Sequence, residues 1–123
     1  MAKHNDTGRW GEDLACDMLV ADGWAIVERN WCMNHLEVDI IAMKGDVLAF
    51  VEVKTRANMD EDPLEAIDRR KITNMVRAAD CYIRTHDMPH QARFDLFAIR
   101  GTHACYEIEH IPDAFEPPLK TYR

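Results

Sequence analysis

The sequence predicts an α/β fold in which two main helices flank a mixed sheet of about five strands. Two stretches carry apolar residues at helical spacing, and five shorter stretches have the apolar character of strands. Their order along the chain is helix, three strands, helix, two strands. We expect one domain over residues 1–123, with a core from about residue 7 to 115 and a tail at 116–123.

The first helix is expected over residues 7–21. Trp10, Leu14 and Met18 recur four residues apart and form its apolar stripe. Gly23 follows as a helix stop. A strand over 24–31 comes next.

The clearest local signal is a hairpin. Two strand-like runs, 36–43 and 47–54, are separated by Lys44-Gly45-Asp46, a sequence typical of tight turns. These two runs are therefore expected to lie side by side as antiparallel neighbours.

The second helix is expected to begin at Asp62-Pro63, because Asp is a good helix cap and Pro suits the first turn. It is expected to run to about Arg84. Its broad apolar face consists of Leu64, Ile67, Ile72, Met75, Val76, Ala79, Tyr82 and Ile83. Two more strands, 93–100 and 105–111, follow around Gly101-Thr102.

Composition excludes several classes of protein. The net charge of −7, from 22 acidic and 15 basic residues, excludes a strongly basic nucleic-acid binder but leaves room for a local basic patch. The four cysteines contain no C-x-x-C pair, so neither a disulfide framework nor a zinc knuckle is expected. Residues 1–9 do not resemble a secretory signal, and no apolar run is long enough to span a membrane. We therefore expect a cytoplasmic protein.

Charged side chains gather on one face of the predicted hairpin. Alternation along a strand places Glu52 and Lys54 on the same face. If the loop has two residues, Gly45-Asp46, then Asp39 is opposite Glu52. The same register places Glu37 opposite Lys54. Three carboxylates and one ammonium group would then share a small area.

Such a cluster requires a cation. Two carboxylates about 5 Å apart repel by roughly 3 kcal/mol at an effective dielectric near 20, and one lysine relieves only part of this. Mg²⁺ or Mn²⁺ would relieve more, with Asp39 and Glu52 as ligands and Lys54 beside the attacking water. The simpler alternative is a surface ion pair, which is the usual meaning of Glu-x-Lys on a strand. The surrounding run 48–53 is almost entirely apolar, however, and this favours an interior strand where an unpaired charge is costly.

The spacing of Asp39, twelve further residues and then Glu52-Val53-Lys54 resembles the PD-(D/E)-x-K motif of the restriction-endonuclease-like superfamily. The wider pattern resembles the uncharacterised bacterial YraN family, which is similar to archaeal Holliday-junction resolvases. One departure is Leu36, where the family usually has Gly. The matching positions are Gly8, Gly11-Glu12, Ala15, Leu19, Gly23, Arg29-Asn30, Glu37 to Ala42, Phe50 to Arg56, Lys71, Ala79, Tyr82, Arg93 to Asp95, His110-Ile111 and Ala114-Phe115.

The resemblance implies a restriction-endonuclease-like fold and a catalytic set. By it, Asp39 and Glu52 bind Mg²⁺ or Mn²⁺ and Lys54 serves the attacking water. Glu12 matches a further acidic position of the resolvase-like site. From the residues alone, Glu12 could flank the buried face of its helix or point to water. Glu37 belongs to the family motif as an accessory acid, but it could equally pair with a neighbouring base.

Three basic residues are candidates for binding nucleic acid: Arg56 by its place just beyond Lys54, Lys71 by its family match, and Arg29. The leading hypothesis is a metal-dependent endonuclease acting on DNA, with branched or junction DNA as candidate substrates. A homodimer is expected, since one small site cannot cut two strands. The alternatives are a non-catalytic DNA-associated or protein-binding module on the same fold and, less favoured, a small-molecule phosphohydrolase.

Overall fold

The computed structural model describes residues 6–56, 62, 65 and 67–115. The predicted tail at 116–123 lies outside this range. No helix within the described part of the chain is both long and apolar enough to cross a membrane. The elements in chain order are α1 (Asp6–Ala21), β1 (Ala25–Met33), β2 (Leu36–Lys44), β3 (Val47–Arg56), α2 (Arg69–Thr85), β4 (Gln91–Thr102) and β5 (Cys105–Ile111).

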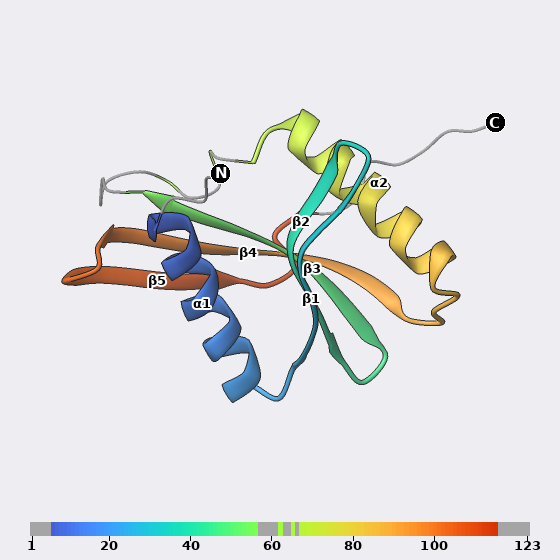
Figure 1. Cartoon of the computed structure of the whole chain (residues 1–123), viewed down its shortest axis with the longest axis horizontal. Coiled ribbons are helices and arrows are strands. Elements are labelled where there is room, and N and C mark those ends of the chain that lie inside the picture. Colours follow the sequence, from blue (N-terminus) through green and yellow to red (C-terminus); the bar gives the residue numbers. More distant parts are fainter. Residues whose placement is uncertain (1–5, 57–61, 63–64, 66, 116–123) are drawn as a thin grey trace.

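The five strands form one mixed sheet in the order β1-β2-β3-β4-β5. Neighbouring strands are antiparallel except for β3 and β4, which run parallel, with α2 in the connection between them. Strands β1 to β3 pass between the two helices (Figure 1). The predicted architecture, a five-stranded mixed sheet with two helices, is confirmed.

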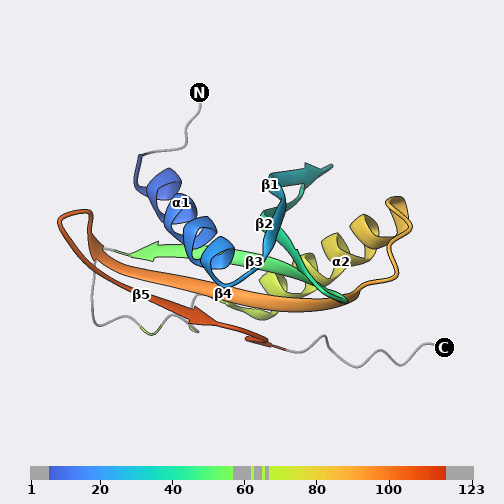
Figure 2. The same cartoon turned by 90° about the horizontal axis from the view of Figure 1, so that it is seen from below.

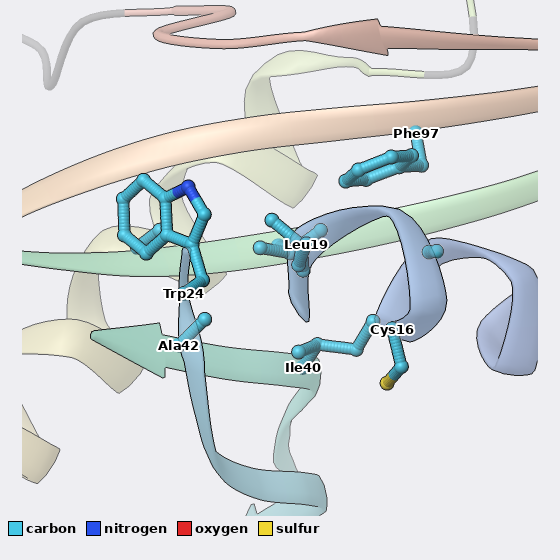
Figure 3. Close-up of a cluster of buried hydrophobic side chains, with 9 residues drawn as sticks. Cys16, Leu19, Trp24, Ile40, Ala42 and Phe97 are labelled. Carbon is cyan, nitrogen blue, oxygen red and sulfur yellow. The ribbon is translucent and has the colours of Figure 1, made fainter. Parts of the chain in front are cut away.

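Each helix covers its own apolar cluster. On the α1 side, Cys16 and Leu19 pack with Ile40 and Phe97 from the sheet (Figure 3). Trp24 joins this cluster and is only 6% exposed. Its backbone N–H donates to the Leu19 carbonyl at 2.9 Å, which keeps Trp24 close to the end of α1.

On the α2 side, Met75 and Tyr82 pack on Phe50 and Phe94. Tyr82 touches Phe50 edge-on, with the ring centroids 6.1 Å apart. The two clusters use opposite faces of the sheet, so β3 is covered on both sides. This double coverage explains why the run 48–53 is apolar.

The β4–β5 hairpin extends beside the first turns of α1 (Figure 2). Trp10 packs there against His103 and Tyr106, with centroids 5.0 Å away in each case. Trp10 is half-buried and lies outside the central core. This contact fixes the start of α1 against the far end of the sheet.

The hairpin loop has two residues as predicted, because Lys44 pairs with Val47. Gly45 has a φ of 59°, a left-handed conformation that glycine adopts without strain.

The predicted start of the second helix is wrong. Ile67 and Asp68 precede the helix, which begins at Arg69. The Asp68 side chain caps it by accepting a hydrogen bond from the Lys71 N–H at 2.8 Å. Two aspartates were available as caps, and the later one is used. Residues 63, 64 and 66 lie outside the described residues.

Candidate active site

The candidate site lies where β2 and β3 stop pairing. The predicted register holds from Lys44 and Val47 to Ile40 and Val51, and there the ladder ends. Beyond it, the Val53 N–H donates to the Asp39 carboxylate at 2.8 Å. A side chain thus satisfies a backbone donor that would otherwise pair with the neighbouring strand.

The divergence of the strands corrects two expected pairings. Asp39 and Glu52 are not ladder partners, and Glu37 pairs with Cys32 of β1 rather than with Lys54. The two strands separate at this point (Figure 1). Asp39 therefore lies in an opening of the sheet instead of on a continuous ladder.

A bend in β1 coincides with this opening. Asn30 has a φ of 53°, a left-handed conformation that is uncommon inside a strand. The register places it across from Asp39. On one side of the bend, Arg29 reaches α1, and on the other, Trp31 stacks edge-on against Tyr82 of α2, with centroids 5.6 Å apart. In a regular strand Arg29 and Trp31 would lie on the same face of the sheet, so the alternation of side chains along β1 is broken at Asn30.

Glu52 lies in the central strand and is only 5% exposed. Two ammonium groups contact the same carboxylate oxygen, Oε2. Lys54 Nζ, from two residues along β3, is 3.2 Å away, and Lys71 Nζ, from the first turn of α2, is 3.3 Å away. The expectation that Glu52 and Lys54 share a face agrees with this contact.

Asp39 lies in an environment with excess negative charge. Burial raises its pKa, and the charges of Glu52 and Glu12 raise it further, to about 7. The hydrogen bond from Val53 and the charge of Lys71 act in the opposite direction but do not cancel the effect. Burial and the neighbouring carboxylates therefore disfavour the ionised form of Asp39.

Glu12 reaches this region because α1 packs closely on the sheet. A Cβ added to Gly11 would collide with Thr55 Oγ1 of β3 and lie 3.1 Å from the Ile99 side chain. The Glu12 side chain is 13% exposed and lies 3.7 Å from Arg29 Nη2. Of the two orientations left open by the sequence, the structure has the one that faces the protein.

A pocket of about 400 Å³ opens beside Glu12. It is lined by Arg9, Glu12, Asp13, Arg29 and Asn30. Arg29 donates to Asp13 at 2.8 Å, and this contact holds its side chain across the pocket wall. The pocket therefore joins α1 to the bend in β1.

The three predicted nucleic-acid-binding residues and Glu37 differ in their exposure and in their contacts. Arg56 is exposed at the end of β3, and its guanidinium donates to the Thr55 carbonyl at 3.2 Å. Arg29 and Lys71 instead contact carboxylates, Asp13 and Glu52 respectively. Glu37 is exposed on β2.

The donor set suits a hard divalent cation. Asp39 and Glu52 supply carboxylate oxygens, and burial, together with the charges of Glu52 and Glu12, raises the pKa of Asp39. Within the described ranges, no group of three or more His, Cys, Asp or Glu side chains could hold a metal ion. Mg²⁺ commonly uses only one or two carboxylates and takes its other ligands from water and phosphate. Asp39 and Glu52 fit that coordination.

Sequence reasoning missed a second buried acid. Asp95 of β4 is fully buried and accepts two hydrogen bonds from Arg93, at 2.9 and 2.8 Å. His110 Nε2 lies 2.8 Å from it, and the Asp113 N–H donates at 3.0 Å. Burial alone would raise the pKa of Asp95, but the bonds from His110, Arg93 and Asp113 outweigh it and hold the pKa below its usual value. A single acid within the apolar run 94–99 was the signal for this cluster.

A solved structure shares this fold. The Holliday junction resolvase Hjc of Archaeoglobus fulgidus matches with a TM-score of 0.51 and 15% identity, over 86% of this chain and 77% of that chain. At this identity the likeness shows a common fold. The predicted architecture is confirmed, and this resolvase shares it.

Closer relatives cover nearly the whole chain. A UPF0102 protein of Bacteroides thetaiotaomicron is 43% identical over 120 residues, which is 97% of this chain and 99% of the relative. The UPF0102 protein FP2501 of Flavobacterium psychrophilum is 40% identical over 116 residues, 94% of this chain and 98% of the relative. The family described as "Uncharacterised protein family UPF0102" matches residues 11–99. The chain therefore belongs to the UPF0102 family, which is the YraN family that its sequence pattern resembles.

Proposed function

We propose that this protein is a metal-dependent nuclease that hydrolyses phosphodiesters in DNA. The observation that carries the proposal is that Asp39 binds the N–H of Val53, the residue between Glu52 and Lys54, where β2 and β3 diverge, and that Lys54 contacts Glu52. The fold is shared with a Holliday junction resolvase, and this supports DNA, including branched DNA, as the substrate class.

Each residue has a defined role in this proposal. Asp39 and Glu52 hold the cation, Mg²⁺ or Mn²⁺, which supplies Lewis-acid stabilisation of the charge on the phosphate. Lys54, beside Glu52, orients the attacking water and donates a hydrogen bond to a phosphate oxygen. Glu12 of α1, whose charge acts on Asp39, adds negative charge that favours cation binding.

DNA binding must overcome the net charge of −7. Phosphate neutralisation dominates the affinity of proteins for DNA, so local basic groups matter more than the total. Arg56 is exposed at the end of β3, the same strand that carries Glu52 and Lys54. We assign Arg56 to a phosphate near the scissile bond. Arg29 and Lys71 would contact further phosphates once they are released from Asp13 and Glu52.

The test is cleavage of four-way junction, flapped and linear DNA in the presence of Mg²⁺ or Mn²⁺. Glu52→Gln and Lys54→Ala should each lower the rate at least about 100-fold, as removal of one charge-stabilising group does in other enzymes. Lys44→Ala is the matched control, because it removes an exposed lysine from the same hairpin. A wild-type protein that binds the metal, remains folded and cleaves none of these substrates would refute the catalytic role.

The second candidate function is a non-catalytic binding module. It is favoured by the contact of Glu52 with two lysines, since that arrangement neutralises the carboxylate without a metal. Calorimetric titration separates the two. A nuclease should take up Mn²⁺ in a manner that depends on Asp39, whereas a binding module should take up none.

Cutting two DNA strands requires two active sites, so the proposal includes a homodimer. Light scattering of the purified protein would measure its mass against the 14.2 kDa of one chain. A monomer at working concentration, in the presence and absence of junction DNA, would contradict this part.

A further inference from the structure

We propose that Lys71 is a metal-displaced latch: it occupies Glu52 in the metal-free protein and releases it when a divalent cation binds. The inference rests on the proposed metal site at Asp39 and Glu52. It concerns how that site is kept closed, which neither the fold nor the family match addresses.

The geometry at Glu52 means that a cation must compete with two lysines. Lys54 and Lys71 both approach Oε2, at 3.2 and 3.3 Å. Glu52 has a side chain that is 7% exposed, so there is little room for further groups at its carboxylate. A cation that binds Glu52 through this oxygen must compete with ammonium groups already in place.

Lys71, and not Lys54, is the lysine that a cation would displace from Glu52. Lys54 is anchored two residues from Glu52 on the same strand and is 25% exposed. Lys71 arrives from a different element, and its side chain is 36% exposed. Its long flexible stem can swing to solvent without moving the backbone. Lys71 also acts electrostatically on Asp39, so it stands near both proposed ligands.

The start of α2 is an unfavourable place for the charge of Lys71. The first turn of α2 begins Arg69-Arg70-Lys71 and contains no acidic residue. Helix N-termini carry partial positive charge and disfavour cations. The Asp68 carboxylate accepts from the Lys71 backbone N–H, so the contact printed for the Lys71 ammonium group is with Glu52. A divalent ion that binds Glu52 would remove this partner of Lys71.

The experiment is calorimetric titration of Mn²⁺ into the wild-type protein, Lys71→Met and Arg70→Met. Methionine keeps the apolar stem and removes the charge. Arg70→Met makes the same change of charge at the neighbouring, exposed position. We expect Lys71→Met to bind Mn²⁺ about three- to tenfold more tightly than wild type, and Arg70→Met to differ less than about twofold.

A spectroscopic readout accompanies the titration. The ¹⁵N signal of the Lys71 ammonium group should report a carboxylate partner in the metal-free protein and lose that signature when diamagnetic Mg²⁺ is added. The Lys54 signal should keep its partner. If Lys71→Met does not fold, Lys71→Gln replaces it, with circular dichroism as the check.

The outcomes separate the latch from the metal site. Equal or weaker Mn²⁺ affinity in Lys71→Met, with wild type binding normally, overturns the latch and leaves the metal site standing. Equal tightening in Arg70→Met also overturns it, because general electrostatics then suffice. No binding by any of the proteins overturns the metal site itself, whereas binding by Lys71→Met alone is the strongest support for the latch.

Discussion

Replacing Asp39 by asparagine should stabilise the metal-free protein at about pH 8, although it removes a hydrogen-bonding acid from the centre of the fold. Asparagine keeps an oxygen that can accept the Val53 N–H, as the carboxylate does at 2.8 Å. It removes the charge that Glu52 and Glu12 repel. The predicted gain is therefore electrostatic.

The size of the gain follows from the shift in pKa. A rise from 3.8 to about 7 means that ionising Asp39 in the folded protein costs at most about 4 kcal/mol, at 1.36 kcal/mol per pKa unit. Because the side chain is half-buried and partly solvated, we expect about 1–2 kcal/mol. The folded state holds the proton more tightly than the unfolded state. The protonated carboxyl thus contributes stability below about pH 4 that is lost as the pH rises through 7.

The assay is urea and thermal unfolding in chelator-containing buffer at about pH 5 and pH 8. Asp39→Asn should be nearly neutral at the lower pH and should raise Tm by about 3–8 °C at the higher pH. Asp95→Asn is the matched control, because it makes the same change at a buried acid whose charge is fully compensated. It should destabilise by about 3–5 kcal/mol near neutral pH. Its effect should shrink as the pH falls through the lowered pKa of Asp95.

One pattern of stability changes would contradict this prediction. If Asp39→Asn lowers stability by the same amount at both pH values, the bond to Val53 dominates and the site carries no excess charge. Added Mn²⁺ gives a second check, since it should stabilise the wild type and not Asp39→Asn.

Three further substitutions test how the site is held. Gly11→Ala should destabilise the protein by about 1–3 kcal/mol in urea melts because its methyl group meets Thr55, and Thr55→Ala in the same chain should restore part of the loss. Asn30→Val should cost about 1–2 kcal/mol, while Asn30→Gly should be nearly neutral, because a left-handed backbone at a φ of 53° is strained for a β-branched residue and unstrained for glycine. Asp68→Ala should cost about 1 kcal/mol by removing the cap of α2, and an unchanged Tm would refute its capping role.

The hairpin shows what sequence reasoning does well. The loop Gly45-Asp46 and the register up to Ile40 and Val51 were predictable, because turn chemistry and a period of two are local properties. The termination of that register was not. The ladder ends where the Asp39 carboxylate accepts from the Val53 N–H, and the alternating pattern within the hairpin does not report that contact.

The start of α2 shows a different limit. Asp62-Pro63 and Asp68 are both acceptable caps, and local propensity does not choose between them. The helix begins where its apolar face, with Met75 and Tyr82, can pack on the sheet. Tertiary packing thus overrode the more conspicuous signal.

The sequence by itself determined the fold class and the family and nominated Asp39, Glu52 and Lys54 as the candidate site, because periodicity, turn residues and the spacing of these three residues are written along the chain. Only the tertiary structure decided that Lys71 meets Glu52 and that Asp95 is compensated. The contacts of Glu52 with Lys71 and of Asp95 with His110 join different elements, and charge energetics depend on burial and on neighbours from other elements. Both arise only when the helices dock on the sheet.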